Sequence, residues 1–445
     1  MTKKSLALKK VVVSLVLFAV STMFVFAGGA KEAAVPATPK KGETVTIKMW
    51  THDDLYRQFF QKRIDLFNQT NNDYKLALDA QIMPNTITAL VTASVAGEDL
   101  PDLIGVEQGW FPTLMENGNV KNLLVDLTDK IGNRYNDYVQ GRWALYTYDG
   151  RIYGLESALT ASVLYYQPAI FEKYGVAIPS TWEEYLQAGK ELAKHGVSIG
   201  IMDNDSSGLF SMMFLQRGGQ FFDEQGKLVF GESENRKAAV QVLAMLREAL
   251  DNKALQVVLG NDFWGSTIPT SFSTGKVAGI VAPDWYNTSV LQPGVASMSG
   301  QWRVAPMPVW SDGKGYSTSV WGGTGFAITK SSKIPEIVWN LLDDAYMSLD
   351  GQLDRYKTIG FYPTMYKALE DPAVTEQEHP FFGNQKIGSI FAKVAKETPP
   401  LWQSEQRPYL LQGIVDTLPL FIEGKLTSEQ FVDTIVKITQ DGATL

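Results

Sequence analysis

The chain has 445 residues, of which 45% are hydrophobic and 11% aromatic, so it can bury large cores and exceeds one ordinary domain. Two lobes of roughly 200 residues each are expected. The formal net charge is −8 and there is no cysteine. The acidic balance argues against nucleic acid or an anionic membrane surface as the main partner. The missing thiol excludes disulfides, zinc–thiolate sites and thiol catalysis.

The first 27 residues have the pattern of a cleaved signal peptide. Four lysines lie between residues 3 and 10, Val11–Phe26 is an apolar run, and Ala27 is a small residue at the expected cleavage site. The run is short for a membrane span, and an uncleaved anchor is the alternative. Residues 28–43 are small, charged and proline-containing, which indicates a flexible spacer or, equally, a tail without function. The mature chain would carry 36 basic and 48 acidic residues, a net charge of −12.

The folded part is expected to begin with alternating strands and helices. Val45–Trp50 is rich in β-branched residues and runs into the polar loop Thr51–Asp54, which can cap a helix. The apolar spacing then predicts a helix to about Asn71, a strand over Tyr74–Ala80, and a second helix that ends at Gly97.

A third strand is predicted over Asp102–Val106, followed by a polar loop and a helix over Phe111–Met115. Strand, helix, strand, helix, strand is typical of a parallel sheet with helices on both faces. Ligands bind such sheets beyond the carboxyl ends of the strands. This rule points to His52–Asp53 after the first strand and to Glu107–Gln108 after the third.

A polar segment lies between two buried runs farther along the chain. Ile152–Leu155 is strand-like, Glu156–Ser162 is polar, and Val163–Tyr166 is apolar again. Such a segment is where a chain can leave one lobe and enter another. Downstream, Ser180 and Thr181 each precede a glutamate by three residues, which is the spacing of a helix capping box. The apolar positions that follow predict a helix with one buried face.

The alternation continues through the second half. Strands are predicted over 197–202, 277–281 and 326–329, and two prolines within 302–309 predict an extended segment there. Helices are predicted over 209–215, 233–250, 270–274 and 335–348, the second of them capped by Ser233. Polar loops between these elements carry Asp205, Ser206, Asp284 and Trp285, and a glycine-rich loop covers 321–325.

No motif for nucleotide or metal chemistry is present in the sequence. Every Gly-Lys pair lacks the Ser or Thr of a phosphate-binding loop, GGTGFA lacks the third glycine of a dinucleotide fingerprint, and no G-x-S-x-G elbow occurs. His52, His195 and His379 lie far apart, so a metal site built on them is not expected. We expect no catalytic residue, no metal and no cofactor.

The predicted loops carry carboxylates and aromatic side chains, namely Asp53, Glu107, Glu156, Asp205, Asp284, Trp110, Trp285, Trp321 and Tyr362. Aromatic faces stack on the C–H faces of sugars while carboxylates and amides accept hydroxyl protons. Most aromatic residues must be core, and Trp182, Phe214, Trp264 and Trp339 are assigned there. Trp285 and Trp321 are candidates for ligand contact. Solvated helix caps explain the loop carboxylates nearly as well.

The order of these motifs resembles that of extracellular solute-binding protein family 1, the sugar-binding subunits of ABC importers that include maltose-binding protein. The resemblance is carried by five segments over nearly the whole mature chain: LPDLIGVEQGW, LMENGNVKNL, DGRIYGL with VLYYQPAIFEKYGV and IPSTWEEYL, FSTGKVAGIVAPDW, and GGTGFAITKSSK with VWNLLDDAYM. Two departures are clear. No cysteine is available for lipidation, and Gly109 follows Gln108 where maltose-binding relatives place an aspartate. Maltose is therefore not the expected ligand.

The resemblance implies a two-lobed α/β fold of the periplasmic binding protein type II class, each lobe a mostly parallel sheet flanked by helices. It implies a first lobe of residues 44–158 plus 318–366 and a second of 159–317 plus 367–445. The implied ligand contacts are His52, Asp53, Glu107, Gln108, Glu156, Asp205, Ser206, Asp284, Trp285, Trp321, Gly322, Gly323 and Tyr362. A monomer outside the cytoplasm would close by a hinge around a carbohydrate and deliver it to the membrane permease.

Two other functions stay open on the sequence. An exported glycosidase would use a carboxylate pair such as Glu107 with Asp284. The protein could instead bind peptides or polyamines, in which case amines and not sugars would raise its melting temperature.

Overall fold

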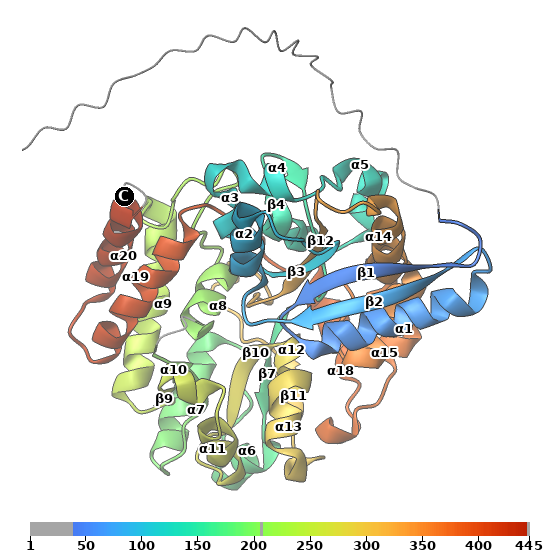
Figure 1. Ribbon diagram of the computed structural model, residues 1–445. Coiled ribbons are helices and arrows are strands. Elements are labelled where there is room, and N and C mark those ends of the chain that lie inside the picture. The colour runs from blue at the N-terminus through green and yellow to red at the C-terminus, as the bar shows by residue number, and fades with distance from the viewer. Residues whose placement is uncertain (1–38, 205–207, 443–445) are drawn as a thin grey trace, which may run out of the picture.

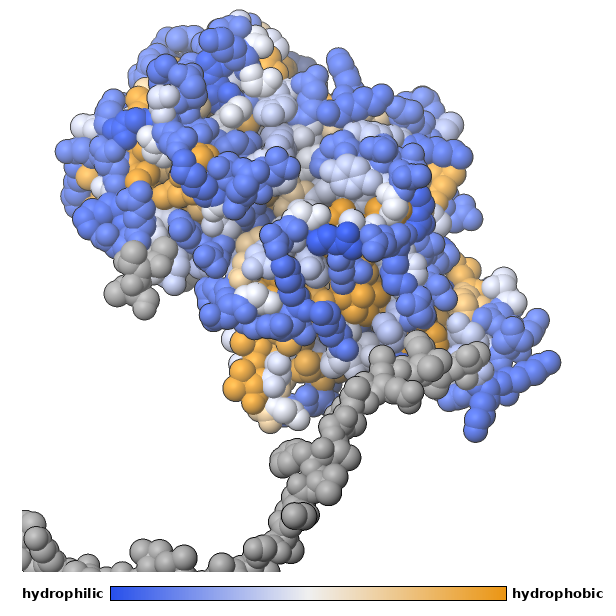
Figure 2. Space-filling model, turned by 90° about the horizontal axis from the view of Figure 1, so that it is seen from above, coloured by the Kyte–Doolittle hydropathy of each residue, from blue (hydrophilic) through white to orange (hydrophobic). Residues whose placement is uncertain are grey.

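The computed structural model describes residues 39–204 and 208–442 (Figure 1). The predicted signal peptide, most of the predicted spacer, Asp205 and Ser206 lie outside these ranges. The described residues form two α/β lobes, and none of their helices is both long and apolar enough to cross a membrane. The surface seen from above is mostly hydrophilic, with hydrophobic side chains in separate patches (Figure 2).

The first lobe contains a five-stranded sheet in the order β2-β1-β3-β12-β6. Its strands are β2 (Tyr74–Ile82), β1 (Glu43–Thr51), β3 (Leu103–Glu107), β12 (Thr324–Ile328) and β6 (Leu155–Glu156). β1 pairs in parallel with β2 and β3, whereas β12 is antiparallel to both β3 and β6. Four strands share one direction and β12 is reversed.

The second lobe repeats this arrangement. β7 (Ser162–Tyr166) lies between β10 (Gly279–Pro283) and β11 (Arg303–Pro306) and is antiparallel to both. β8 (Gly200–Asp203) pairs in parallel with β9 (Leu255–Val258), and a parallel bridge from Ser198 to Val277 joins this pair to β10. Here β7 is the reversed strand. The prediction of mostly parallel sheets is therefore confirmed for strand direction, with one antiparallel strand in each lobe.

Helices cover both faces of the first sheet. Neighbouring residues of β3, whose side chains point to opposite faces, accordingly pack into different cores. Leu103 packs in the core that contains α1, and Ile104 in the core that contains α2. The helices of this lobe are α1 (Asp54–Thr70), α2 (Thr86–Ala96), α3 (Phe111–Met115), α4 (Asn119–Leu123), α5 (Thr128–Ile131), α14 (Pro335–Leu342) and α15 (Leu349–Ile359), with the turns η1 (Glu116–Gly118), η2 (Gly132–Asp137), η3 (Gln140–Tyr146) and the π-helical η6 (Asp343–Met347). A short hairpin joins β4 (Thr147–Tyr148) to β5 (Arg151–Ile152).

The remaining helices surround the strands of the second lobe. They are α6 (Pro168–Tyr174), α7 (Trp182–Ala193), α8 (Gly208–Gln216), α9 (Ser233–Asp251), α10 (Gly260–Phe263), α11 (Thr267–Ser273), α12 (Asp284–Tyr286), α13 (Gln292–Gly294), α16 (Tyr366–Leu369), α17 (Pro372–Thr375), α18 (Ile387–Ala395), α19 (Arg407–Ile422) and α20 (Ser428–Gly442), with the turns η4 (Asn287–Leu291), η5 (Ala296–Met298) and η7 (Pro380–Phe382). Figure 1 shows α9, α19 and α20 packed together at one side of the molecule.

The helix ends follow local signals in the sequence. The Asp53 side chain accepts a hydrogen bond from the backbone N–H of Leu55 at 2.9 Å and so caps α1. Gly97 ends α2 with a left-handed φ of 71°. Of the two possible caps of α7, Thr181 is the one used, and Glu184 completes the capping box.

Three predicted elements differ from the structure. The strand-like run 152–155 is split between β5 and β6 because Gly154 packs against the Tyr146 ring, where a Cβ would lie 3.1 Å from Cγ. Ser233 is the first residue of α9, and Glu232 precedes the helix without a side-chain cap. The helix predicted over 335–348 becomes π-helical from Asp343, and Ser348 instead caps α15.

Candidate functional site

A cavity of about 480 Å³ lies where strands of both sheets end. β1 and β3 end beside it, and α12 follows the end of β10; Figure 1 shows β1 pointing toward the middle of the molecule, near α12. The lining residues are His52, Asp53, Tyr56, Glu107, Ala158, Trp264, Trp285, Ser289, Val290, Trp321, Gly322, Gly323, Thr324 and Phe361. The structure thus brings together seven of the sequence-predicted residues, namely His52, Asp53, Glu107, Trp285, Trp321, Gly322 and Gly323.

Three indole rings form one wall of the cavity. The Trp285 centroid lies 5.9 Å from that of Trp264 and 5.6 Å from that of Trp321. The Trp264 and Trp321 centroids are 6.3 Å apart. The Trp285 indole N–H donates to the Trp321 carbonyl at 2.8 Å, which fixes the ring. Trp264 was expected in the core but is 57% exposed. Because the rings contact one another, they present a continuous apolar surface.

His52 and Asp53 line the same cavity, directly after the end of β1. One carboxylate oxygen of Asp53 accepts the hydrogen bond that caps α1. The His52 ring contacts Tyr56 and Trp110, with centroids 5.9 Å and 5.3 Å away, and its Nε2 is 3.5 Å from the Thr324 hydroxyl. Burial lowers the pKa of His52, with the Asp53 charge opposing that shift. The imidazole is therefore neutral at pH 7 and can donate or accept a hydrogen bond.

Glu107 and Gln108 connect the main cavity to a second one of about 220 Å³, which shares Glu107, Trp321 and Gly322 with it. The Glu107 carboxylate accepts a hydrogen bond from the Gly109 N–H at 2.6 Å. Burial raises the pKa of Glu107 to about 7, although Arg407 and the Gly109 amide act against the shift. Gln108 is buried, and its Oε1 has no hydrogen-bond partner among the described residues. Gln108 thus contributes to the second cavity rather than to the main one.

Arg407 also lines this second cavity, and sequence reasoning missed it. Its guanidinium is buried and donates to the Gln403 side-chain oxygen at 2.5 Å. Burial lowers the pKa of Arg407 to about 10, and the nearby Glu107 charge opposes that change. Glu107 and Arg407 thus place a carboxyl group and a guanidinium in the lining of one cavity, where both can form hydrogen bonds with a polar ligand group.

The backbone at Gly322 and Gly323 forms another wall of the main cavity. Their φ angles are 73° and 124°, which other residues rarely adopt. A Cβ on Gly323 would lie 2.5 Å from Arg142 Nη2 and 3.0 Å from Glu156 Oε2. The two glycines therefore separate the cavity from a buried ion pair.

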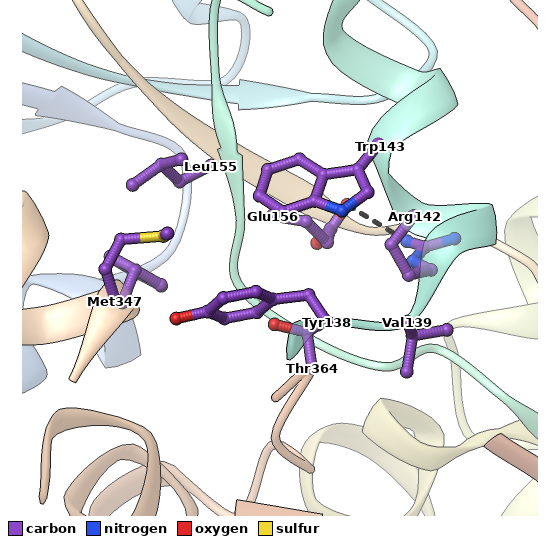
Figure 3. A pocket seen from close by; sticks show the side chains of 9 residues that line it. Tyr138, Val139, Arg142, Trp143, Leu155, Glu156, Met347 and Thr364 are labelled. Carbon is purple, nitrogen blue, oxygen red and sulfur yellow. Dashed lines mark hydrogen bonds and ion pairs between the residues drawn. The ribbon is translucent and has the colours of Figure 1, made fainter. Parts of the chain in front are cut away.

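Glu156 does not line the cavity, contrary to expectation. Its carboxylate accepts hydrogen bonds from Arg142 Nη2 at 3.0 Å and from the amides of Ser157 and Ala158 at 2.9 Å and 3.1 Å. Figure 3 shows the Arg142–Glu156 pair beside a much smaller cavity of about 10 Å³, near Tyr138. The Glu156 oxygens thus bind groups of the protein itself, and a contact of Glu156 with a ligand stays a prediction.

Asp284 and Tyr362 are likewise buried away from the cavity. Asp284 is 0% exposed, and its carboxylate accepts a hydrogen bond from the Trp285 N–H at 2.8 Å. Burial raises the pKa of Asp284 to about 7 against the opposing effect of that amide. Tyr362 packs between Tyr356 and Phe391. Its neighbour Phe361 faces the cavity instead, because successive residues of this segment belong to different cores.

Sequence signals existed for some of the missed residues. Tyr56 lies one helical turn after the predicted contacts at 52–53, and Phe361 precedes the predicted Tyr362. No signal indicated Arg407, which is distant from Glu107 in sequence. Trp182, Phe214 and Trp339 are buried as expected. Asp205 and Ser206 lie outside the described residues.

Residues 62–382 match the family model described as bacterial extracellular solute-binding protein. The arabinooligosaccharide-binding protein of Bacillus subtilis (strain 168) is 26% identical over 406 residues, which cover 89% of this chain and 91% of that protein. The lactose-binding protein of Rhizobium radiobacter is 24% identical over 362 residues, covering 79% and 80%.

Solved structures share the two-lobed fold. The galacto-N-biose-/lacto-N-biose I-binding protein of an ABC transporter from Bifidobacterium longum has a TM-score of 0.72 at 23% identity, covering 90% of this chain and 98% of that one. The sugar-binding protein MalE from Xanthomonas citri has a TM-score of 0.73 at 18% identity, covering 89% and 97%. The expected fold class is confirmed. Since the family model spans most of its length, the chain belongs to the bacterial extracellular solute-binding protein family.

Proposed function

We propose that this solute-binding protein captures an oligosaccharide in the main cavity and delivers it to the permease of an ABC importer. The observation that carries the proposal is the cavity lined by three indoles together with Asp53 and Glu107. Indole faces stack on sugar C–H groups, and the carboxylates accept hydroxyl protons. A volume of about 480 Å³ is within the range of about 300–1,000 Å³ common for small-molecule sites. The names of the arabinooligosaccharide- and lactose-binding relatives support a carbohydrate.

The ring geometry disfavours an aromatic cage for a cationic ligand such as a polyamine. Such a cage surrounds the cation with several ring faces. Here the indole centroids are only 5.6 Å to 6.3 Å apart, so the rings touch and leave no space for an ammonium group between them. A flat ligand face that stacks on the outside of the wall fits better.

Burial of Asp284 disfavours the glycosidase hypothesis. A glycosidase needs two carboxyl groups that flank the scissile bond inside the site. Glu107 lines the cavity, but Asp284 is 0% exposed and does not reach it, and Asp53, the other carboxylate of the lining, has one oxygen engaged as the cap of α1. We therefore infer a binding protein that does not change its ligand chemically.

The proposed lobes are residues 44–158 with 318–366 and residues 159–317 with 367–445, and the protein is proposed to act as a monomer outside the cytoplasm. The paths of the strands support this division, because β6 and β12 belong to the first sheet while β7 and β11 belong to the second. Three connecting segments would then bend as a hinge, and ligand contacts with both lobes would favour the closed state.

Calorimetric titration of the purified protein tests this function. We expect binding to at least one of three series, the arabino-, galacto- and malto-oligosaccharides, and none to spermidine. Trp285→Ala removes the central ring of the wall. The loss of one large buried aromatic contact costs about 1.5–3 kcal/mol of binding free energy. The dissociation constant should therefore rise about tenfold to a hundredfold.

Tyr409→Ala on α19 is the matched control, because this aromatic ring is exposed and lines none of the cavities described above. It should leave affinity unchanged. Binding of Trp285→Ala within twofold of the wild type would contradict the stacking role, and an absence of carbohydrate binding in the wild type would contradict the function.

A further inference from the structure

Trp264 differs from the other two indoles of the wall in its exposure to solvent. It is 57% exposed, whereas Trp285 and Trp321 are partly covered. Its position is nevertheless fixed, because one face stacks on Trp285 with 22° between the planes and its edge contacts Phe263 at 5.1 Å. The ring therefore holds an uncovered apolar face at the rim of the cavity.

Trp264 directly follows α10, close to the C-terminal end of β9. It lines the main cavity and is itself exposed, so its ring lies where the cavity meets solvent. Asp262 and Ser266, two residues to either side of Trp264 in the sequence, are exposed as well. A sugar ring can stack on such an aromatic face while a carboxylate or hydroxyl close by bonds to its hydroxyls.

The smaller cavity shares Trp321 with the main one. Its lining is mostly apolar, with Glu107 and the buried Arg407 as its charged side chains. The hydroxyls of a sugar unit can form hydrogen bonds with these two groups. Trp264 lines the main cavity and not the smaller one.

We propose that Trp264 forms an outer subsite, and that the ligand is a linear oligosaccharide longer than a disaccharide. This inference rests on the proposed function. The inner units lie against Trp285 and Glu107, and the next unit stacks on the free face of Trp264. Units beyond it extend into solvent, so the protein binds chains of several lengths with the same inner contacts.

Calorimetric titration across chain length tests the outer subsite. Ligands from a disaccharide to a hexasaccharide are taken from whichever of the three series binds the wild type. We expect wild-type affinity to rise about tenfold from the disaccharide to the longer chains and then to level off. In Trp264→Ala this gain should vanish, so that the ratio of dissociation constants between short and long ligands approaches one.

Two further variants give matched controls. Glu107→Gln should weaken every chain length together and keep the ratio, since it removes an inner contact and leaves the stacking of Trp264 on Trp285 in place. Trp264→Phe should restore part of the gain, because a smaller ring remains in place. Because Trp264 is largely exposed, its variants should melt close to the wild-type temperature.

The outcomes separate the two claims. A Trp264→Ala protein that keeps the wild-type length dependence overturns the outer subsite while leaving the proposed function intact. A Trp264→Ala protein that binds all chain lengths equally more weakly also overturns the outer subsite, because Trp264 would then belong to the inner site. If the wild type binds none of the three series, the proposed function fails, and the inference fails with it.

Discussion

Two buried carboxyl groups, Glu107 and Asp284, lie at the ends of β3 and β10, and burial raises the pKa of each to about 7. A folded-state pKa above the unfolded-state pKa means that protonation favours the folded protein. The resulting stabilisation is complete in acid, below the unfolded-state pKa, and is lost as pH rises through about 7. Burial lowers the pKa of His52 and His379, which removes stability as pH falls. Because these effects on stability oppose one another, the pH dependence of the wild type alone does not isolate the contribution of Asp284, and single variants are compared with it.

Asp284→Asn removes one of the two acid-stabilising groups. Wild-type stability includes an Asp284 contribution that decreases by about 2 kcal/mol from pH 5 to pH 8, whereas the variant lacks it. We expect the variant to be more stable relative to the wild type at pH 8 than at pH 5. The free energy of unfolding of the variant minus that of the wild type should therefore increase between these two pH values. Urea denaturation at the two pH values measures this difference.

Asp312→Asn is the control for this experiment. Hydrogen bonds from Arg217 lower the pKa of Asp312 to about 2, so its contribution is lost only as pH falls toward 2. The difference between this variant and the wild type should be the same at pH 5 and pH 8. An equal difference for Asp284→Asn would show that the Asp284 pKa is not raised.

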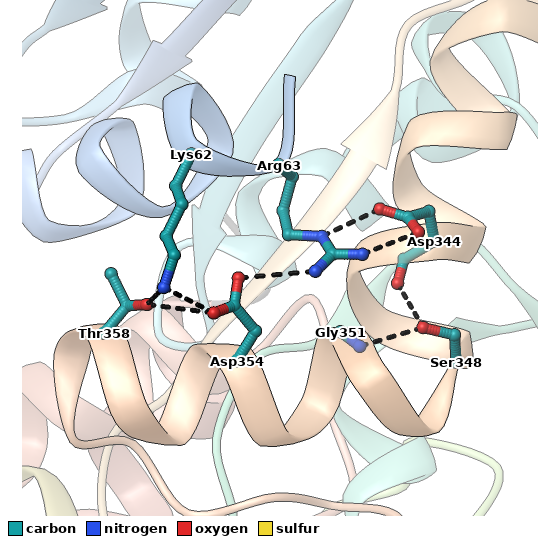
Figure 4. Close-up of polar contacts among 7 residues, drawn as sticks. All are labelled: Lys62, Arg63, Asp344, Ser348, Gly351, Asp354 and Thr358. Carbon is teal, nitrogen blue, oxygen red and sulfur yellow. Dashed lines mark hydrogen bonds and ion pairs between the residues drawn. The ribbon is translucent and has the colours of Figure 1, made fainter. Parts of the chain in front are cut away.

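Among the elements, α1 is held to α15 and η6 by a buried guanidinium (Figure 4). Arg63 donates two hydrogen bonds to Asp344 at 2.8 Å and 2.7 Å and a third to Asp354 at 3.3 Å. The Asp344 carbonyl accepts a hydrogen bond from Ser348, which caps α15. Since α1 begins at the cavity and α15 leads into a connecting segment, this network joins the site to the proposed hinge.

Arg63→Met should destabilise the first lobe because it leaves Asp354, which is 15% exposed, without one partner. A fully buried pair would lose 3–5 kcal/mol, but Asp344 is 46% exposed, and solvent screening reduces the effect. We expect a loss of about 1–3 kcal/mol in the free energy of unfolding, measured by urea denaturation. The matched variant Arg57→Met, whose partner Asp54 is exposed, should unfold like the wild type. Equal stability of the two variants would contradict the role of this network.

For the whole molecule, the cavity between the lobes predicts closure on ligand binding. Contacts from the first lobe, such as Asp53 and Glu107, and from the second, such as Trp285, favour the state in which both reach the ligand. We expect a saturating oligosaccharide to decrease the radius of gyration measured by small-angle X-ray scattering. Trp285→Ala at the same ligand concentration should show a smaller decrease. An unchanged radius for the saturated wild type would contradict hinge closure.

The sequence by itself determined the local structure and the class of fold. Asp53, Gly97 and Thr181 mark helix ends through interactions with residues only a few positions away, so they could be identified without a structure. The alternation of strands and helices predicted α/β sheets and the chain length predicted two lobes, whereas the resemblance to a family of binding proteins implied the two-lobed fold with a ligand cleft. The rule that ligands bind beyond strand ends brought out His52, Asp53 and Glu107, and loop composition brought out Trp285 and Trp321.

Only the tertiary structure decided which polar and aromatic side chains face the cavity. Glu156 and Asp284 occupy loops by sequence, but folding buries both carboxylates, and Arg142 binds an oxygen of Glu156. Trp264 has a large aromatic side chain of the kind usually buried in a core, yet no later segment in the described chain covers it completely. Arg407 reaches Glu107 only through folding. The burial of a residue depends on which distant segments of the chain pack against it. The periodicity of the sequence shows only on which face of its own helix or strand the residue lies, so it does not predict that packing.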